Sequence, residues 1–272
     1  MNRLFLFLVN HFSAPVLNVF QEMGKIFILL GQILQSIGRV VRDPNKFRKF
    51  YYRLILEQMV ATGVNSIPVV VTTALFTGMV LAVQTGVTME AKLQGASIFV
   101  GSIVNLALIR ELGPVLTGLL VTGRVGSAMA AEIGTMKITE QVDALRTLAT
   151  NPVEYLAMPR FVAVMLMMPM LSLMADVLGS LGGWAVATFY LGVNSHVYWH
   201  GAQVTVHMYD VFTGLAKSAV FGLILCVFAL HRGFETFGGA EGVGRATTGA
   251  VVNASITLLI VDYFLTQAFA LF

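Results

Sequence analysis

The sequence predicts an all-α integral membrane protein, with an N-terminal interfacial amphipathic helix followed by five transmembrane helices. Two observations lead to this fold class. Of the 272 residues, 57% are hydrophobic and only 11% are charged, whereas charged residues make up about 25% of a soluble domain. Eight of the 17 Lys and Arg residues precede residue 54, and such clusters mark the cytoplasmic side of a membrane. That topology accounts for the net charge of +3, so we expect no nucleic-acid partner.

The first element that we expect is a helix over residues 15–42 that lies in the membrane interface. Apolar residues recur there with a 3.6-residue period, and polar residues keep the same period on the opposite face. A helix surrounded by lipid would not carry a continuous polar stripe, whereas an interfacial helix does. A sixth span is the competing interpretation. We therefore divide the chain into an N-terminal region, residues 1–53, and a five-span domain, residues 54–272.

Five apolar stretches are long enough to cross a bilayer. Pro68 lies in the first stretch and is expected to kink it, because proline removes a backbone hydrogen bond. The segments 84–96 and 192–210 are nearly free of Lys and Arg, which places them outside, with the N-terminus inside and the C-terminus outside. The stretches are residues 60–85, 98–125, 161–191, 211–230 and 251–272.

Small residues repeat every four positions in the second span, and this spacing lets a neighbouring helix approach closely. The neighbour is either another span of the same subunit or a second subunit. The first series is Gly118, Thr122, Gly126 and Ala130, and the series beside it is Gly123, Ser127 and Ala131.

Two charged residues, Arg110 and Glu111, lie near the middle of the second span. An ionisable residue at this depth costs about 2.5–3.5 kcal/mol or more, so it should face protein or a water-filled cavity. Lys217 and Asp262, in the fourth and fifth spans, are available partners of the right sign. The charges either hold helices together as buried ion pairs or line a path for a substrate. Gly113-Pro114 is expected to break the helix just afterwards.

Between the second and third spans, residues 132–145 form the longest charged interlude in the middle of the chain. Apolar residues at positions 138, 142, 145 and 149 share one stripe of a helix, and Pro152 is expected to end that helix. The segment is either a solvated helical loop or a short amphipathic helix that is presented to another protein.

Several functional classes find no support. No G-x-x-x-x-G-K-[ST] phosphate loop is present, so the chain is not its own P-loop ATPase, and no catalytic constellation stands out. His196, His200 and His207 lack an HExxH arrangement and a nearby cysteine, and we expect no metal. The one cysteine, Cys226, excludes an internal disulfide. The first twelve residues lack a cleavage site and are not expected to be a cleaved signal peptide.

Four blocks of sequence resemble the MlaE/YrbE permeases of MCE-type ABC transporters, and the Gram-negative phospholipid systems most closely. They are LIRELGPVLTGLLVTGRVGSAMAAEIGTMKITEQVDAL, NPVEYLAMPRF, GRATTGAVV and the final VDYFLTQ. The resemblance implies a non-catalytic permease subunit that moves phospholipids between the inner and outer membranes and maintains outer-membrane lipid asymmetry. It implies a homodimer that holds lipid in a cavity at its interface, in the bacterial inner membrane.

The resemblance also implies partners. These are a cytoplasmic ABC ATPase that binds the ATP, a periplasmic MCE-domain lipid-binding protein and a small accessory cytoplasmic subunit, with no cofactor in this chain. A coupling helix, at about residues 132–149, docks on the ATPase. The implied lipid-binding residues are Arg110, Glu111, Leu112, Leu81, Lys217 and Asp262. The implied coupling residues are Glu132, Gly134, Thr135, Met136, Ile138, Glu140 and Val142.

Two other classes of function remain open on the residues alone. One is an ion-coupled secondary transporter, in which Arg110, Glu111, Asp176, Lys217 and Asp262 form a proton or ion relay. The absence of an internal inverted repeat argues against it. The other is a scaffold that anchors a lipid-binding partner without transporting anything.

Overall fold

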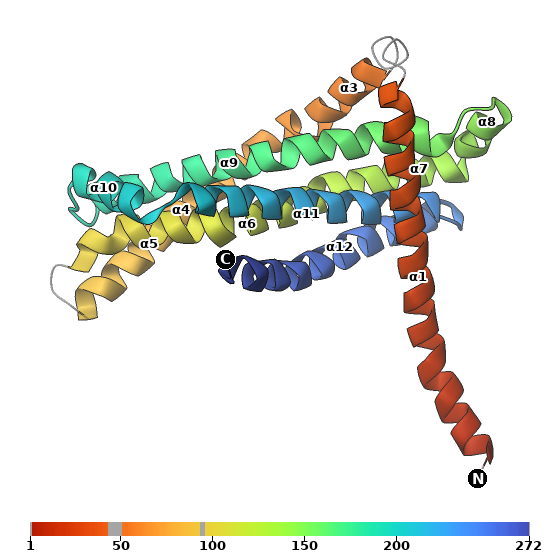
Figure 1. The fold of residues 1–272 in the computed structure, drawn as a ribbon, viewed down its shortest axis with the longest axis horizontal. Coiled ribbons are helices and arrows are strands. Elements are labelled where there is room, and N and C mark those ends of the chain that lie inside the picture. Colours follow the sequence, from red (N-terminus) through yellow and green to blue (C-terminus); the bar gives the residue numbers. More distant parts are fainter. Residues whose placement is uncertain (1, 43–50, 93–95, 272) are drawn as a thin grey trace.

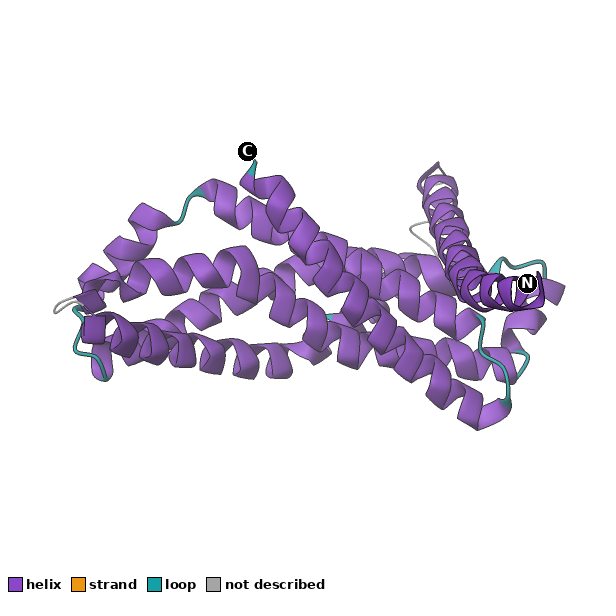
Figure 2. Ribbon diagram, turned by 90° about the horizontal axis from the view of Figure 1, so that it is seen from below, coloured by secondary structure: helices purple, strands orange, loops and turns teal. Residues whose placement is uncertain are grey.

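The described part of the chain, residues 2–42, 51–92 and 96–271 of a computed structural model, consists of helices joined by short turns and loops, with no strand (Figure 2). Five helices are long and apolar enough to cross a membrane: Tyr52–Ala91, Val100–Ile138, Val153–Phe189, Met208–Phe234 and Gly239–Ala270. They contain the five predicted stretches except at the start of the second and at the ends of the third and fifth, and most extend beyond them into polar residues. The predicted all-α membrane fold is confirmed.

Several of these spans consist of successive helical segments with different hydrogen-bonding patterns. The α-helices are α1 (Asn2–Arg42), α3 (Tyr52–Thr62), α4 (Ile67–Lys92), α5 (Val100–Ala107), α6 (Gly113–Val121), α7 (Ser127–Ile138), α8 (Gln141–Thr147), α9 (Met158–Phe189), α10 (Ser195–Thr205), α11 (Met208–Phe234) and α12 (Gly239–Ala270). The remaining segments are the 3₁₀-helices η2 (Val64–Ser66) and η3 (Ala96–Phe99) and the π-helices η4 (Leu108–Leu112), η5 (Thr122–Gly126) and η6 (Val153–Ala157).

Helix α1 crosses the end of the bundle near α7 and α8, at a steep angle to the spans (Figure 1). It buries Leu29, Ile33 and Val40 against the bundle, whereas Phe20 and Phe27 on other faces are exposed. It is not among the helices that are apolar enough to cross a membrane. This placement favours the interfacial interpretation over a sixth span.

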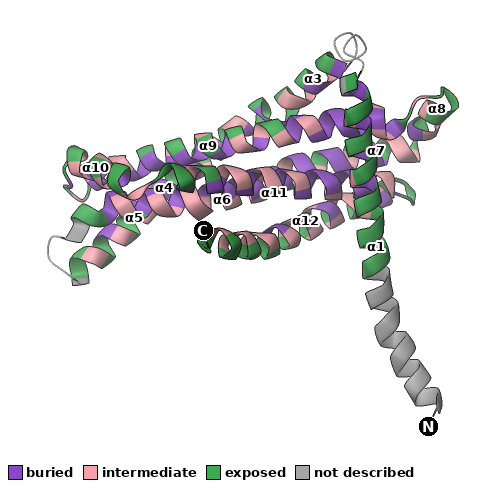
Figure 3. Cartoon of the chain, viewed as in Figure 1, coloured by how far each residue is buried: buried purple, intermediate pink, exposed green. Residues whose placement is uncertain are grey.

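The core is formed where α4, α9 and α11 pack along the length of the bundle. Glycines allow α4 and α9 to come close, because a Cβ atom at Gly78 would overlap the backbone of Gly179. A Cβ atom at Gly182 would likewise lie only 2.3 Å from the Leu75 carbonyl oxygen. Burial is high along α9 and α11, and α12 is much more exposed (Figure 3).

Helix boundaries differ from the expectation in the first and second spans. The first span is interrupted at Gly63–Ser66. Pro68 lies in the first turn of α4, where the missing backbone N–H would have no partner within the helix, so it does not kink the helix. Gly113-Pro114 does not break the second span, which continues because η4 inserts a wider turn just before Pro114. Helix α4 continues to Lys92 through most of the predicted outside loop, and α10 occupies part of the second one.

The segment 132–149 is helical, but it is not the single helix that the apolar stripe predicts. Helix α7 continues the second span to Ile138, and the separate helix α8 begins at Gln141. Glu140 between them has a left-handed backbone, with φ of 61°. Helix α8 ends at Thr147, before Pro152. The Asn151 side chain accepts a hydrogen bond from the Val153 amide at 2.9 Å, which starts the next span.

Candidate substrate cavity and coupling segment

A cavity of about 400 Å³ lies between the second span, the beginning of α11 and the end of α12. One part of its wall is apolar and the other part is charged. The lining residues are Ile103, Leu106, Ala107, Arg110, Glu111, Thr213, Lys217, Thr266, Phe269 and Ala270. The cavity can therefore accommodate an apolar chain beside a polar group.

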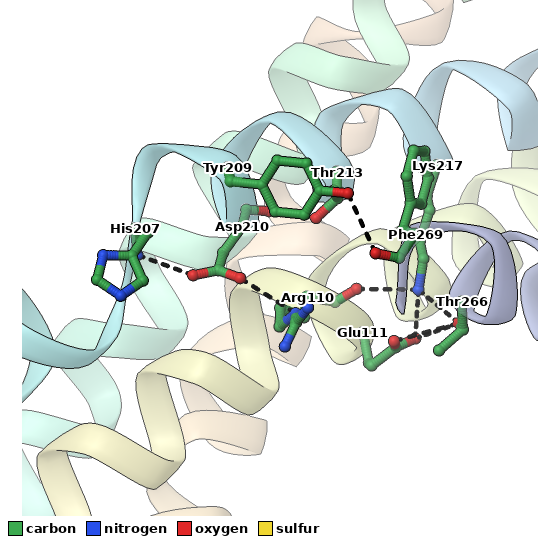
Figure 4. A network of polar contacts seen from close by, with 9 residues as sticks. All are labelled: Arg110, Glu111, His207, Tyr209, Asp210, Thr213, Lys217, Thr266 and Phe269. Carbon is green, nitrogen blue, oxygen red and sulfur yellow. Dashed lines mark hydrogen bonds and ion pairs between the residues drawn. The ribbon is translucent and has the colours of Figure 1, made fainter. Parts of the chain in front are cut away.

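Lys217 organises the polar part of this cavity (Figure 4). Only 2% of its side chain is exposed, and its Nζ lies 2.6 Å from Glu111 Oε2 and 3.4 Å from Asp262 Oδ1. It also donates to Thr266 Oγ1 at 2.8 Å. One cation thus faces two carboxylates from different spans, which satisfies the rule that charges at bilayer depth are paired. The structure brings together three of the predicted lipid-binding residues.

The π-helical turn η4 explains how Lys217 reaches the second span. A π-helical turn widens the hydrogen-bond pattern and is frequent at functional sites. The Arg110 carbonyl oxygen, in this turn, accepts a hydrogen bond from Lys217 Nζ at 3.2 Å. The same ammonium group therefore binds the backbone of the π turn and the Glu111 side chain that the turn presents.

Arg110 points to a partner that the sequence reasoning missed. Its Nε lies 3.1 Å from Asp210 Oδ1, and only 7% of the Asp210 side chain is exposed. Asp210 also accepts from the backbone amide of His207 at 2.8 Å and so caps the start of α11 (Figure 4). The Asp210 carboxylate thus connects the start of the fourth span to the middle of the second.

The other two predicted lipid-binding residues lie apart from this cavity in the single chain. Leu81 and Leu112 are half-buried and pack against the core cluster around Tyr198 and Val104. Asp176 also lies elsewhere, on α9, and makes no hydrogen bond or ion pair with the Lys217 network among the described contacts. The five charged residues of the hypothetical ion relay therefore do not form one connected chain.

The predicted coupling residues occupy both faces of the α7–α8 segment. Glu132, Thr135 and Glu140 are exposed, and Met136 and Ile138 are half-buried. Val142 is 1% exposed and anchors α8. Gly134 is buried against Thr236, whose Oγ1 would lie 2.7 Å from a Cβ atom at that position. Gly134 and Val142 therefore hold the segment to the bundle, and the exposed residues form its free surface.

Two ion pairs fix the shape of this segment. Lys137 Nζ lies 2.8 Å from Asp143 Oδ2 and connects α7 with α8 across the turn. The hydrogen bond from Lys137 lowers the pKa of Asp143 below its ordinary value. Glu132 pairs with Arg160 at 2.9 Å, and the Arg160 side chain is only 7% exposed. The segment is thus tied to the start of α9 as well as to the end of the second span.

A further charged cluster attaches α1 to the end of α11. Lys25 Nζ lies 2.9 Å from Glu22 and 2.8 Å from Glu235, and His231 Nε2 lies 3.1 Å from Glu22 Oε2. The hydrogen bonds from Lys25 and His231 lower the pKa of Glu22. The hydrogen bonds to Glu235 and Glu22 raise the pKa of Lys25. Glu22, His231 and Glu235 lie close enough together to share a metal ion. Lys25 pairs with both carboxylates and Arg232 Nη1 lies 3.8 Å from Glu22 Oε2, so we interpret the group as an ion-pair cluster.

Comparison with known proteins identifies the family. The Permease MlaE family matches residues 55–268. The chain is 36% identical over 263 residues to the intermembrane phospholipid transport system permease protein MlaE of Haemophilus influenzae, covering 95% of this chain and 97% of that protein. A probable ABC transporter permease protein of Rickettsia bellii is 42% identical over 96% of this chain and 97% of its own length.

A chloroplast protein of Arabidopsis thaliana, TRIGALACTOSYLDIACYLGLYCEROL 1, is 37% identical over 81% of this chain and 63% of its own length. The similarity thus extends beyond bacteria. The chain therefore belongs to the MlaE permease family, and it is a multi-pass membrane permease subunit rather than an enzyme.

Proposed function

We propose that this chain is the permease subunit of an ABC transporter that moves phospholipids between the inner and outer membranes and maintains outer-membrane lipid asymmetry. The observation that carries the proposal is the cavity with an apolar wall at Leu106 and Phe269 and a charged end at Lys217. A phospholipid needs both surfaces, one for its acyl chains and one for its head group. The name of the Haemophilus relative, an intermembrane phospholipid transport permease, agrees with this substrate.

We propose that two copies of the chain complete the lipid site. At about 400 Å³ the cavity is near the lower end of the range for ordinary ligand pockets, so a lipid with two chains requires further walls. The second series of small residues supports a second subunit, because a Cβ atom at Gly123 would meet nothing within 4 Å. In such a dimer, the half-buried Leu81 and Leu112 are proposed to contribute apolar lining.

We propose that ATP binding in a separate cytoplasmic ABC ATPase acts on the cavity through the α7–α8 segment. The surface of Glu132, Thr135, Met136, Ile138 and Glu140 is the proposed contact, positioned by Gly134 and Val142. A rigid element that touches both partners can transmit such a change, because a conformational shift requires contacts that differ between states. The chain itself would need no cofactor.

The remaining partners and the location follow from the proposed pathway. A periplasmic MCE-domain protein would exchange lipid with the permease, and a small accessory subunit would accompany the ATPase in the cytoplasm. We place the chain in the bacterial inner membrane, with residues 1–53 and the α7–α8 segment in the cytoplasm and the C-terminus in the periplasm. The basic residues before position 54 support this orientation.

Affinity purification from solubilised membranes tests the proposal, with mass spectrometry of both protein and bound lipid. We expect an ABC ATPase and an MCE-domain protein to co-purify, with phospholipid retained. Recovery of the chain alone, transporting without ATP, would favour the ion-coupled transporter instead. A complex that keeps full function after Glu111→Lys would favour the scaffold.

A further inference from the structure

A second cavity, of about 430 Å³, lies on the other side of η4 from the cavity around Lys217. It is bordered by α5, α9, α10 and the start of α11, and its wall is mainly apolar. Leu173, Val177 and Leu181 of α9 line it and are each at least 39% exposed. Trp199 of α10 lines it as well. Because α9 belongs to a candidate membrane span, these exposed side chains give the cavity an opening towards the lipid.

Asp176 is the unusual group in this cavity. The side chain lines the cavity although the residue is only 6% exposed, and its Oδ1 has no hydrogen-bond partner among the described residues. This oxygen is buried against Gly113, at the end of the η4 turn, so a ligand in the cavity would reach the other carboxylate oxygen, Oδ2. Glu111 and Asp262 face Lys217, and Asp210 faces Arg110. Asp176 thus differs from the other carboxylates of this region, since a buried polar group normally has a partner.

We propose that this cavity is a second lipid-binding site, which takes a single-chain amphiphile whose polar end donates a hydrogen bond through a free hydroxyl group to Asp176. The apolar wall suits one alkyl chain, and the volume is that of an ordinary ligand pocket with a few polar groups. A neutral hydroxyl group can donate to Asp176 without the cost of taking a second charged group out of water into the apolar cavity. The proposal concerns binding alone and stands independently of the proposed transport function.

The chain provides its own reporter for this site. It has two tryptophans, Trp184 and Trp199, and only Trp199 lines the cavity. In a Trp184→Phe background reconstituted in phosphatidylethanolamine and phosphatidylglycerol nanodiscs, Trp199 fluorescence is titrated with a long-chain alcohol that carries bromine at mid-chain. We expect saturable quenching. A brominated alkane of the same length, which lacks the hydroxyl, should bind about tenfold more weakly.

Three substitutions and one matched control, all in the Trp184→Phe background, distinguish a binding site from general partitioning into the membrane. Asp176→Leu should weaken binding of the alcohol about tenfold, and Asp176→Asn, which keeps an acceptor, should change it less. Ala202→Phe fills the cavity from α10 and should abolish saturation. Val204→Phe is the matched control, because Val204 lies on the same helix, is 61% exposed and does not line the cavity. Folding is checked by thermal unfolding and by Trp199 emission without probe.

Three results would overturn the proposal. The first is quenching that rises linearly with the probe and is equal in all the variants, which indicates partitioning into the bilayer. The second is saturable quenching that is unchanged in Asp176→Leu or that shows the same affinity for the alcohol and the alkane. Either observation would mean that Asp176 does not bind the hydroxyl group. The third is quenching that disappears when the permease is purified with its partner subunits, which would make the cavity a protein contact.

Discussion

Lys217 and Glu111 are 106 residues apart in the sequence, and their charged atoms lie 2.6 Å apart, between the second and fourth spans. Asp262 adds a carboxylate from the fifth span at 3.4 Å. The ion pairs thus serve two purposes that the sequence left as alternatives. They join three spans, and they form the polar wall of a cavity that also has apolar surface.

Replacing Lys217 with methionine should destabilise the protein strongly. Truncating one partner of a fully buried pair costs about 3–5 kcal/mol, because the remaining charge stays buried without compensation. The loss here should be smaller, because 38% of the Glu111 side chain is exposed and solvent screens its charge. Here Glu111 and Asp262 would be left facing each other. Thermal unfolding in detergent measures the effect. The double variant Lys217→Met/Glu111→Gln should recover part of the stability, and additive losses in the double variant would contradict the coupling between the two residues.

Charge reversal at Glu111 should abolish lipid transfer and leave the complex assembled. Glu111→Lys would place a second ammonium group beside Lys217, whereas the α7–α8 segment and its contacts lie far along the span. Transfer of labelled phospholipid between donor and acceptor vesicles measures activity, and co-purification of the ATPase measures assembly. Ile103→Leu, at a cavity position without charge, is the matched control. Full activity of Glu111→Lys would exclude a role for Glu111 in the cavity.

Glu140 should tolerate glycine and reject proline. Its φ of 61° is outside the range that proline can adopt, and glycine reaches it without strain. Glu140→Pro should therefore disrupt the turn between α7 and α8 and weaken binding of the ATPase by at least tenfold. Glu140→Gly preserves the turn but removes the side chain, so it should bind the ATPase with a smaller loss. Binding is measured with purified subunits, and equal losses for the two variants would show that the side chain matters more than the turn.

Adding a methyl group at Gly134 should loosen the coupling segment. A Cβ atom there would lie 2.7 Å from Thr236 Oγ1, and such overpacking typically costs about 1–3 kcal/mol. Gly134→Ala should reduce stimulation of the ATPase by the permease. Thr236→Ala removes the opposing oxygen, so the double variant should regain most of the stimulation. Failure of this rescue would mean that Gly134 acts through the ATPase contact itself rather than through packing.

Acidic pH should release α1 from the end of α11. The hydrogen bonds from Lys25 and His231 lower the pKa of Glu22 in the folded protein. The ionised Glu22 side chain therefore stabilises the packing of α1 on α11 at any pH above the ordinary pKa of a glutamate, and this stabilisation is lost as the pH falls through the lowered pKa. Spin labels at the exposed Phe27 of α1 and at the exposed Phe237, in the turn that follows α11, report the distance between α1 and the end of α11. We expect the distance to increase well below pH 4.5. Glu22→Gln should remove this pH dependence, and an unchanged response in that variant would assign it to other groups.

The spans and the Lys217 network could be predicted from sequence because the underlying physics is simple. Long apolar stretches have few alternatives to crossing a membrane, and charges inside them need partners of opposite sign. Asp210 was missed because it stands at the polar edge of a span, where a carboxylate is unremarkable. Only the fold brings it 3.1 Å from Arg110.

The irregular parts of the helices could not be predicted. The turn at Thr139 and Glu140 contains no glycine or proline, and the apolar stripe from Ile138 to Val142 continues across it. Similarly, nothing in the hydropathy of residues 108–112 distinguishes a π turn from an α turn. These features depend on tertiary contacts, such as the bond between Lys137 and Asp143 and that between Lys217 and the Arg110 backbone.

The second span continues without a loop from Val100 to Ile138, through η4 and η5. At about 1.5 Å per residue, Glu111 and Ile138 are about 40 Å apart along one rod. A π-helical turn contains one residue more than an α-helical turn. Deleting one residue within η5 would therefore rotate α7 and α8 by about 100° about the helix axis relative to Glu111. The η5 turn therefore sets the angular position of the α7–α8 segment relative to the Glu111 side chain in the cavity.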